Sequence, residues 1–467
     1  MAAPPEHLKK GGALSHLKTR MPSGSDVTQR ADPKPAFSDD LFEQVVHPAN
    51  LQQAWKRVRA NKGAAGVDGM SIDDFPVWVK SGAWMQVKSE LGSGAYLPQP
   101  VRRVEIDKPD GGKRMLGIPT VIDRVIQQAI AQVLTPIFDP TFSNNSFGFR
   151  PHRSGQQAVK QVQQIVKQKR RIAVDVDLSK FFDQVNHDLL MSLLSHKVHD
   201  KRLKQLIARY LRAGFIDNQF FHETREGVPQ GGPLSPLLAN IMLDPLDKEL
   251  EKRGHHFARY ADDFMILVKS QRAGERVLRS ITKYLQDRLK LEINTDKSQV
   301  VNAKESKFLG FTFKNGKIKW HPKTLHKFKQ RIRELTNRNW GVSMRRIVGP
   351  YQLFKISQYI RGWVNYFGIA NCYQLCCDLD HWIRRRVRMA YWRQWRKPRT
   401  KVRNLMRLGR SDDSVHVKTA VGCGITSKGP WRSAKTPGIN QALSNEYLKK
   451  AGLVSLRDGW IKLHYSG

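Results

Sequence analysis

Two adjacent carboxylates stand in an otherwise apolar stretch of the sequence. Asp262 and Asp263 follow Tyr260 and Ala261, with apolar residues at 257–258 before them and at 264–268 after them. An ionised acid removed from water costs several kcal/mol unless it is paired or bound to a metal. Two acids at the tip of a β-hairpin suit Mg²⁺, which prefers hard oxygen ligands and serves phosphoryl chemistry. The pattern therefore predicts either a metal site or a solvated Asp-Asp turn.

A second acidic strand lies upstream and favours the metal site. In residues 172–178, strand alternation puts Asp175 and Asp177 on one face and the apolar side chains on the other. Asp177 ends this strand, which allows it to lie beside Asp262 and Asp263. Three carboxylates suffice for two Mg²⁺ ions, one activating a 3′-hydroxyl and the other holding a triphosphate. We expect these three acids to be the catalytic metal ligands, with Asp175 beside them as a non-ligand.

The chain is strongly basic. Its 467 residues include 80 Lys and Arg against 41 Asp and Glu, a formal net charge of +39. Such self-repulsion destabilises a compact chain unless a polyanion neutralises it, so we expect nucleic acid as a partner and salt-dependent binding. The sequence has no apolar run of the roughly 18 residues that span a membrane, no apolar signal core at its start and no Cys-x-x-Cys pair. These features predict a cytoplasmic protein that joins the nucleoid when bound to target DNA.

The pattern of apolar residues divides the chain into five parts. Residues 1–38 predict a flexible basic arm, 39–71 an N-terminal extension with a helix capped by Asn50, and 72–315 an α+β mixture of helices and strand pairs. Helical stripes with basic opposite faces dominate 316–400, which predicts an all-α module. The segment 401–467 predicts a basic, loop-rich tail.

The chain resembles the reverse transcriptases encoded by bacterial group II introns. The likeness rests on Tyr260-Ala-Asp-Asp263, Asp177-Leu-Ser-Lys-Phe-Phe182-Asp183, Gly227-Val-Pro-Gln230-Gly-Gly-Pro-Leu-Ser-Pro236, Lys108-Pro-Asp-Gly-Gly-Lys-Arg114, Asn145-Ser-Phe-Gly-Phe-Arg-Pro151, Leu291-Glu-Ile-Asn-Thr-Asp-Lys297 and Arg361-Gly-Trp-Val-Asn-Tyr-Phe-Gly368. It implies an α+β right-hand polymerase, with fingers and palm of reverse transcriptase type at 72–315 and an all-α maturase thumb, called domain X, at 316–400. The resemblance further implies RNA-directed DNA synthesis, binding of the host intron RNA to promote splicing, and mobility by target-primed reverse transcription.

The resemblance also implies a role for each matched residue. Asp177 and Asp262 would be the main metal ligands, supported by Asp263. Lys108 and Arg114 would bind the triphosphate, and Phe182 would exclude a ribose 2′-hydroxyl. The other nucleotide-binding residues would be Gln230, which would line the pocket, and Tyr260, which would lie near the primer end. The alternatives stay open: Phe182 as ordinary core, Lys108 and Arg114 as solvated turn charges, and Gln230 as a brace of its loop. Lys297 is either a proton donor to pyrophosphate or a surface lysine.

The basic face of the helical module is the predicted nucleic-acid surface. Its residues are Arg384, Arg385, Arg386, Arg393, Arg396, Lys397 and Arg399. The expected partners are group II intron RNA, an RNA template with its DNA primer, target DNA and dNTPs, bound mostly through phosphate, 2′-hydroxyl and shape contacts.

One family feature is missing from the sequence. Many members continue into a zinc-stabilised endonuclease, but no further cysteine follows Cys423. We therefore expect an endonuclease-lacking protein that resembles the class C members, whose C-terminal region is similar to 424–432 and 441–447.

Two other functions remain open on the sequence alone. One is a reverse transcriptase domesticated for phage defence or DNA repair, which genomic flanks without an intron RNA would favour. The other is a non-catalytic splicing factor, whose signature would be loss of an acid from the triad; all three acids are present.

Overall fold

The structure is a computed structural model that describes residues 40–107, 112–217, 220–337, 350–408 and 429–465. The predicted arm 1–38 and Lys108 lie outside these ranges. Within them, none of the helices is long and apolar enough to cross a membrane.

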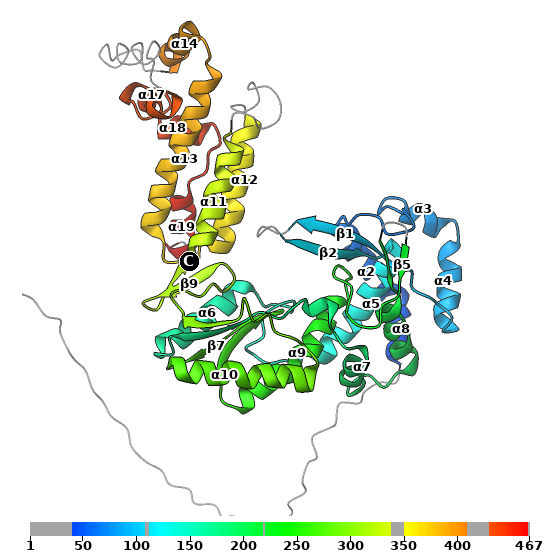
Figure 1. Cartoon of the computed structure of the whole chain (residues 1–467). Helices are drawn as coiled ribbons and strands as arrows, with labels where there is room; N and C mark the ends of the chain where they lie inside the picture. Colours follow the sequence, from blue (N-terminus) through cyan, green and yellow to red (C-terminus); the bar gives the residue numbers. More distant parts are fainter. Residues whose placement is uncertain (1–39, 108–111, 218–219, 338–349, 409–428, 466–467) are drawn as a thin grey trace, which may run out of the picture. The chain divides into compact units, whose positions relative to one another are not determined.

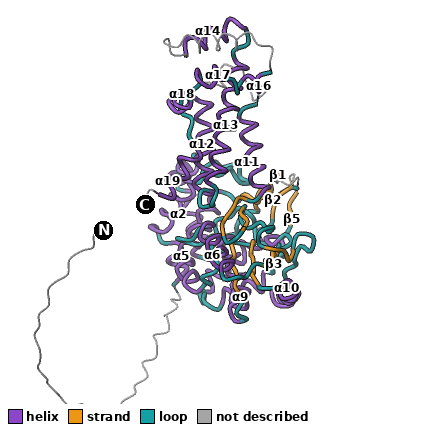
Figure 2. The backbone as a smooth tube through the Cα atoms, turned by 90° about the vertical axis from the view of Figure 1, so that its left-hand side faces the viewer, coloured by secondary structure: helices purple, strands orange, loops and turns teal. Residues whose placement is uncertain are grey.

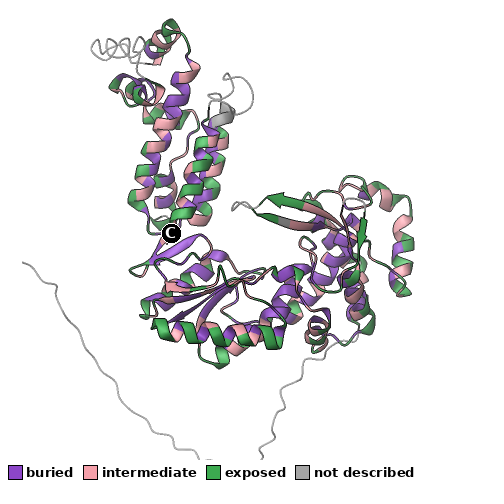
Figure 3. Cartoon of the chain, in the orientation of Figure 1, coloured by how far each residue is buried: buried purple, intermediate pink, exposed green. Residues whose placement is uncertain are grey.

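A four-stranded antiparallel sheet carries the acidic segments. Its strands are β3 (Ile172–Val176), β6 (His256–Tyr260), β7 (Asp263–Val268) and β8 (Gln299–Asn302), in the order β6-β7-β3-β8. Figure 1 shows helices on both faces of this sheet, and Figure 3 shows its strands largely buried. Helix α6 (Gly155–Lys167) packs on the face that bears Ala173, Met265 and Leu267, while α9 (Ser235–Lys252) and α10 (Gln271–Tyr284) pack on the face that bears Val174, Phe264 and Ile266. Burial on both faces explains the nearly continuous apolar run in β7.

A second four-stranded sheet is formed by segments far apart in the sequence. It consists of β1 (Val101–Asp107), β2 (Lys113–Ile118), β4 (Phe215–Asp217) and β5 (Phe220–His222), in the order β2-β1-β4-β5 with β1 and β4 parallel. The surrounding helices are α1 (Leu41–Val46), α2 (Pro48–Ala60), α3 (Phe75–Lys80), α4 (Ala83–Gly92), α5 (Val121–Phe138), α7 (His187–Ser195) and α8 (Lys201–Arg212), with short turns η1 (Asp139–Thr141) and η2 (Phe181–Asp183). The π-helical turn η3 (Leu285–Leu289) instead continues α10. These helices share one apolar core with the inner face of the first sheet.

The region 316–400, predicted as an all-α module, is helical in its described residues apart from a strand at its start. A small hairpin, β9 (Phe311–Lys314) and β10 (Lys317–Trp320), leads into α11 (Pro322–Leu335), α12 (Pro350–Phe367) and α13 (Tyr373–Gln394), which run alongside one another in Figure 2. Trp320 joins the hairpin to α12, because its indole N–H donates to the carbonyl of Phe367 at 2.9 Å and its ring packs edge-on against Trp363.

The prediction of a loop-rich tail is wrong for the described residues. After α14 (Pro398–Leu408), the chain forms α16 (Pro430–Ser433), α17 (Pro437–Ala442), α18 (Asn445–Lys450) and α19 (Leu456–Tyr465). These helices are short, so their apolar residues make no long periodic stripe, yet Ile439, Leu448, Leu456 and Trp460 enter the core of the helical region.

Helix α2 shows that the presence of a helix was easier to predict than its first residue. The predicted helix from Asn50 is present as α2, but it begins two residues earlier at Pro48, and His47 accepts the N–H of Ala49 as its cap. The Asn50 side chain instead donates to the carbonyls of Val45 and Ala129, which ties α2 to α5. Tertiary contacts therefore overrode a local capping preference.

Thr120 caps α5, the buried helix behind the second sheet, and gives a stability prediction. Its hydroxyl accepts the N–H of Asp123 at 3.1 Å and donates to the Asp123 carboxylate at 2.7 Å, and Thr120 is 1% exposed. We expect Thr120→Val to lower the free energy of unfolding by about 1–3 kcal/mol, since it removes a cap and a donor to a buried acid. Urea denaturation followed by tryptophan fluorescence measures this.

The matched control lies on the same helix. The Thr135 hydroxyl only donates back to the carbonyl of Ala131. Thr135→Val should therefore cost much less than Thr120→Val, and equal losses from the two variants would refute the capping role.

Candidate active site

The register of the first sheet brings the predicted carboxylates to one edge. Val176 of β3 pairs with Phe264 of β7, so one further step places Asp177 across from Asp263. Tyr260 pairs with Asp263 in the β6–β7 hairpin, which leaves Ala261 and Asp262 as the two turn residues. Strand alternation puts the side chains of Asp177 and Asp263 on the same face. The hairpin and the strand that sequence reasoning linked are thus neighbours.

The electrostatics of this edge call for a cation. Burial, together with the nearby carboxylates of Asp175, Asp262 and Asp177, raises the pKa of Asp263 to about 8, against a smaller opposing effect of Lys307. Burial likewise raises the pKa of Asp175 to about 6. Like charges crowded in a buried place disfavour ionisation unless a positive ion neutralises them.

The donor set fits a hard divalent metal ion. Within the described ranges, no group of three or more His, Cys, Asp or Glu side chains is close enough to hold a metal ion as it stands. The mutual effects on the pKa of Asp263 nevertheless place Asp175, Asp177 and Asp262 within electrostatic reach of it. Carboxylate oxygens are the ligands that Mg²⁺ prefers.

The loop before β8 holds the backbone of Asp177. The Asp177 N–H donates to the hydroxyl of Ser298 at 3.1 Å, and the Asn294 N–H donates to the Asp177 carbonyl at 2.7 Å. Lys297 places its ammonium 4.0 Å from the Asp177 carboxylate, and both side chains are about half exposed. Lys297 therefore lies beside the edge that bears Asp177, and both of its predicted roles stay open.

Phe182 and Gln230 meet at one cavity. It has a volume of about 260 Å³ and lies between β1, β2, the η2 turn and the loop 224–230. Phe182 is 7% exposed, and its carbonyl accepts the N–H of Val228 at 2.6 Å. The Gly117 N–H donates to the Gln230 carbonyl at 2.8 Å. Backbone hydrogen bonds from β2 and from the η2 turn to the segment 228–230 therefore hold the walls of this cavity in place.

Sequence reasoning missed the cations that line this cavity. Arg103 of β1 and Lys180 before η2 both contribute to the lining. Arg103 lies over the Phe215 ring at 4.3 Å from its centroid, while Lys180 adopts a positive φ of 42°. Lys180 stands between Asp177 and Phe182 in the acidic motif, which was a signal for its place. Arg114, which the sequence predicted to hold the triphosphate, lies in β2, and its backbone pairs with Ile106 of β1.

Two aromatic residues from other parts of the chain, Phe149 and Tyr366, lie near Tyr260 of the hairpin. The Tyr260 ring lies 6.4 Å from that of Phe149, which is 49% exposed and has a positive φ of 59°. Burial raises the pKa of Tyr366 to about 12, with further contributions from Tyr260 and Asp263. Tyr366 belongs to α12, so the helical region contributes a side chain near the β6–β7 hairpin. Nothing in its helical spacing distinguished Tyr366 from a core residue.

The predicted basic residues differ in what they contact. Arg385 stacks 3.8 Å above the Trp431 ring and donates to the Trp431 carbonyl, while Arg386 donates to the Thr336 hydroxyl at 2.9 Å. These two therefore hold helices together as well as adding charge. Arg384, Arg385 and Trp431 line a cavity of about 610 Å³, whereas Arg393 is half-buried and Arg396, Lys397 and Arg399 are exposed.

Comparison with known proteins places this architecture. The family described as "Reverse transcriptase (RNA-dependent DNA polymerase)" matches residues 106–313, and the "Group II intron, maturase-specific domain" matches residues 325–409. Protein YkfC of Escherichia coli is 33% identical over 58% of this chain and 81% of its own length. The chain belongs to the group II intron-encoded reverse transcriptase family. Its α+β part is the reverse transcriptase fingers and palm, and the helical region after it carries the maturase domain.

More distant relatives are similar over a smaller share of their length. The group II intron-encoded protein LtrA of Lactococcus lactis is 30% identical, but the match spans 58% of this chain and about half, 56%, of LtrA. A chain of a partial Cas6-RT-Cas1–Cas2 complex is 26% identical over 53% of this chain and 42% of its own, with a TM-score of 0.34. The family match makes this chain an RNA-directed DNA polymerase with a splicing-related maturase domain.

Proposed function

We propose that this protein copies RNA into DNA with two Mg²⁺ ions held by Asp177, Asp262 and Asp263. When bound, the ions would neutralise the triphosphate and lower the pKa of the primer's 3′-hydroxyl. The observation that carries the proposal is the strand register that places Asp177 beside the Tyr260–Asp263 hairpin. The pKa of Asp263, raised by burial and by its neighbouring acids, supports it because a bound cation would relieve that repulsion.

The protein's own groups would bind and orient the nucleotide. We place the deoxyribose in the cavity that Phe182 and Gln230 line, where the Phe182 ring would exclude a 2′-hydroxyl. Arg103 and Lys180 supply positive charge at the same cavity, where a triphosphate needs it.

We further propose that the basic face of α13 and α14 binds the intron RNA and target DNA. The match to the maturase-specific domain covers both helices, which favours an intron-linked role over a domesticated one. The exposed Arg396, Lys397 and Arg399 suit phosphate contacts, so affinity should fall steeply with salt.

Primer extension on an RNA template tests the polymerase. Wild-type protein with Mg²⁺, dNTPs and a DNA primer should make full-length cDNA, and either EDTA or Asp262→Ala should abolish it. No extension by the wild type, or equal extension by Asp262→Ala, would refute the proposal.

The cavity cations give a separate prediction. We expect Arg103→Ala to raise the KM for dNTPs about tenfold, because hydrogen bonds to charged groups contribute about 1.5–3 kcal/mol. Lys113→Ala is the matched control, since Lys113 is exposed and pairs with Glu105 on the same two strands. Steady-state single-nucleotide incorporation separates KM from kcat, and a normal KM in Arg103→Ala would remove Arg103 from the binding site.

A further inference from the structure

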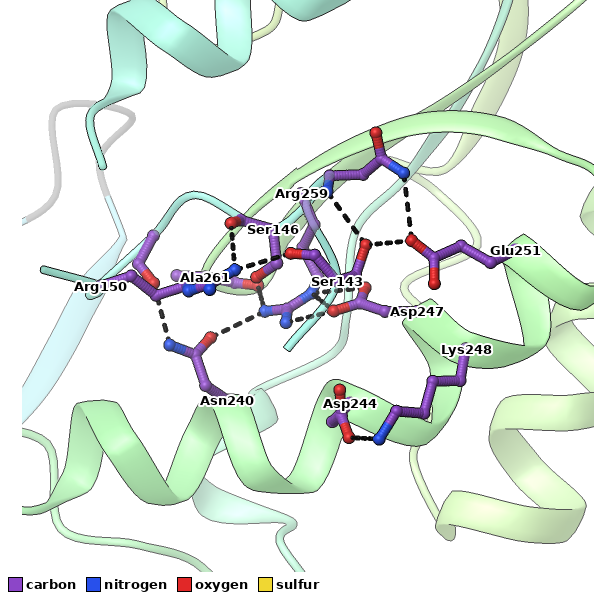
Figure 4. Close-up of polar contacts among 12 residues, drawn as sticks. Ser143, Ser146, Arg150, Asn240, Asp244, Asp247, Lys248, Glu251, Arg259 and Ala261 are labelled. Carbon is purple, nitrogen blue, oxygen red and sulfur yellow. Dashed lines mark hydrogen bonds and ion pairs between the residues drawn. The ribbon is translucent and has the colours of Figure 1, made fainter. Parts of the chain in front are cut away.

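An ion pair lies buried directly behind the catalytic hairpin. The Arg259 guanidinium and the Asp247 carboxylate of α9 are both 0% exposed, with Nη2 and Oδ2 2.6 Å apart (Figure 4). Removing two charges from water carries a penalty that their attraction repays only partly, and apolar residues of similar volume are often as stable. The pair therefore calls for an explanation other than stability.

The guanidinium also reaches the turn of the hairpin. Nε donates to Asp247 Oδ1 at 2.8 Å, while Nη1 donates to Asn240 Oδ1 at 3.0 Å and to the Ala261 carbonyl at 2.9 Å. Figure 4 shows these bonds converging on Arg259 from α9 on one side and the turn on the other. Arg259 thus links a rigid helix to the peptide that precedes Asp262.

The turn is held in a strained shape. Ala261 has a φ of +59°, a region that costs an L-residue roughly 1–2 kcal/mol and in two-residue hairpins favours Gly, Asn or Asp. Such a conformation persists only where its surroundings over-determine it. The carbonyl that Arg259 grips belongs to this strained residue.

The loop 147–148 packs against the turn as well, and together with Arg259 it forms a clamp around Ala261. A Cβ on Gly148 would lie 2.2 Å from the Ala261 nitrogen, so the two backbones are in close contact. Asn240 donates to the Gly148 carbonyl at 2.9 Å, and the Phe147 N–H donates to the Arg259 carbonyl at 2.9 Å. One helix therefore fixes both the turn and the loop packed against it.

We propose that Arg259 is a positioning residue that sets the two catalytic carboxylates of the hairpin. It holds the Ala261 carbonyl, and through it the direction in which Asp262 and Asp263 face Asp177. Alternation places the Arg259 side chain on the sheet face opposite to that of Asp263, so it acts without touching substrate or metal. The inference rests on the proposed role of these carboxylates.

Arg259→Lys is the first test. Lysine keeps the positive charge beside Asp247 but has no second branch to hold Ala261. We expect kcat for single-nucleotide incorporation to fall about 10²-fold, as a misplacement of about 1 Å can produce, with the dNTP KM and template–primer affinity within about twofold of wild type. Arg253→Lys is the control. Arg253 pairs with Glu249 at the exposed end of α9, the helix that also carries Asp247, so this variant should remain fully active.

A double variant separates positioning from folding. Asp247→Leu with Arg259→Met replaces the pair by apolar side chains and leaves no buried charge unpaired, so its thermal unfolding midpoint should lie well above that of Arg259→Met alone. We expect it to remain as slow as Arg259→Lys. A double variant that is both stable and fully active would overturn the inference.

Hydrogen exchange gives a readout that does not depend on activity. The amides of 261–263 should exchange faster in Arg259→Lys, while those of β3 keep their protection. A wild type that makes no cDNA would overturn the proposed function alone, because the exchange still reports on the clamp. Unchanged exchange at 261–263 would overturn the inference, and faster exchange would uphold it.

Discussion

Asp177→Asn should lower the rate of nucleotide incorporation on an RNA template at least about 10³-fold, the largest effect expected from any single substitution here. The reason is that Asn would remove the charge of a proposed metal ligand at the point where phosphoryl charge develops, which is worth several kcal/mol. Template–primer affinity should change little, because it depends on basic residues elsewhere. Rapid-quench single-turnover kinetics measures the rate, and filter binding measures the affinity.

The neighbouring acid provides the matched control. Asp175 lies on the same face of β3, and its carboxylate accepts a hydrogen bond from Ser306 at 3.3 Å. Because we place Asp175 outside the ligand set, Asp175→Asn should cost less than about tenfold. A loss as large as that of Asp177→Asn would show that the ligands have been misassigned.

Phe182→Ala should admit ribonucleotides, with discrimination against rNTPs falling about 10²-fold. The ring is almost completely buried and lines the cavity where we propose that the nucleotide binds, so its removal would open space for a 2′-hydroxyl. Incorporation of dNTPs should stay near the wild-type rate. The ratio of kcat/KM for a dNTP and the matching rNTP measures the effect.

Phe181 separates a sugar gate from ordinary core packing. Its ring is 2% exposed and stands edge-on to that of Phe182, with centroids 5.1 Å apart. Phe181→Ala should lower stability without changing discrimination. If Phe182→Ala behaves in the same way, Phe182 is a core residue and the gate hypothesis is wrong.

The polymerase core was predictable because its signals are local. Alternation around Asp175 and Asp177 predicted β3, and paired acids between apolar runs predicted the β6–β7 hairpin; both are confirmed. That Asp177 lies across from Asp263 depends on the strand register, which the motifs suggest and the pairing of β3 with β7 establishes.

The missing parts depend on contacts between distant segments. Arg103, Tyr366 and the Asp247 partner of Arg259 become functional candidates only when β1, α12 and α9 are placed in space. One signal was present: Asn240 and Asp247 are seven residues apart on the face of α9 that also bears Leu243 and Leu250, where polar residues need a buried partner. The helical tail was missed because its short helices bury only a few residues each.

The number of metal ions bound at the carboxylates tests the central claim most directly. Mn²⁺ can replace Mg²⁺ and be counted by electron paramagnetic resonance in a complex with template–primer and a non-hydrolysable dNTP. We expect two Mn²⁺ ions per wild-type complex. When Asp177 and Asp262 are both changed to Asn, we expect at most one Mn²⁺ ion, which the triphosphate carries. A double variant that still binds two would contradict it.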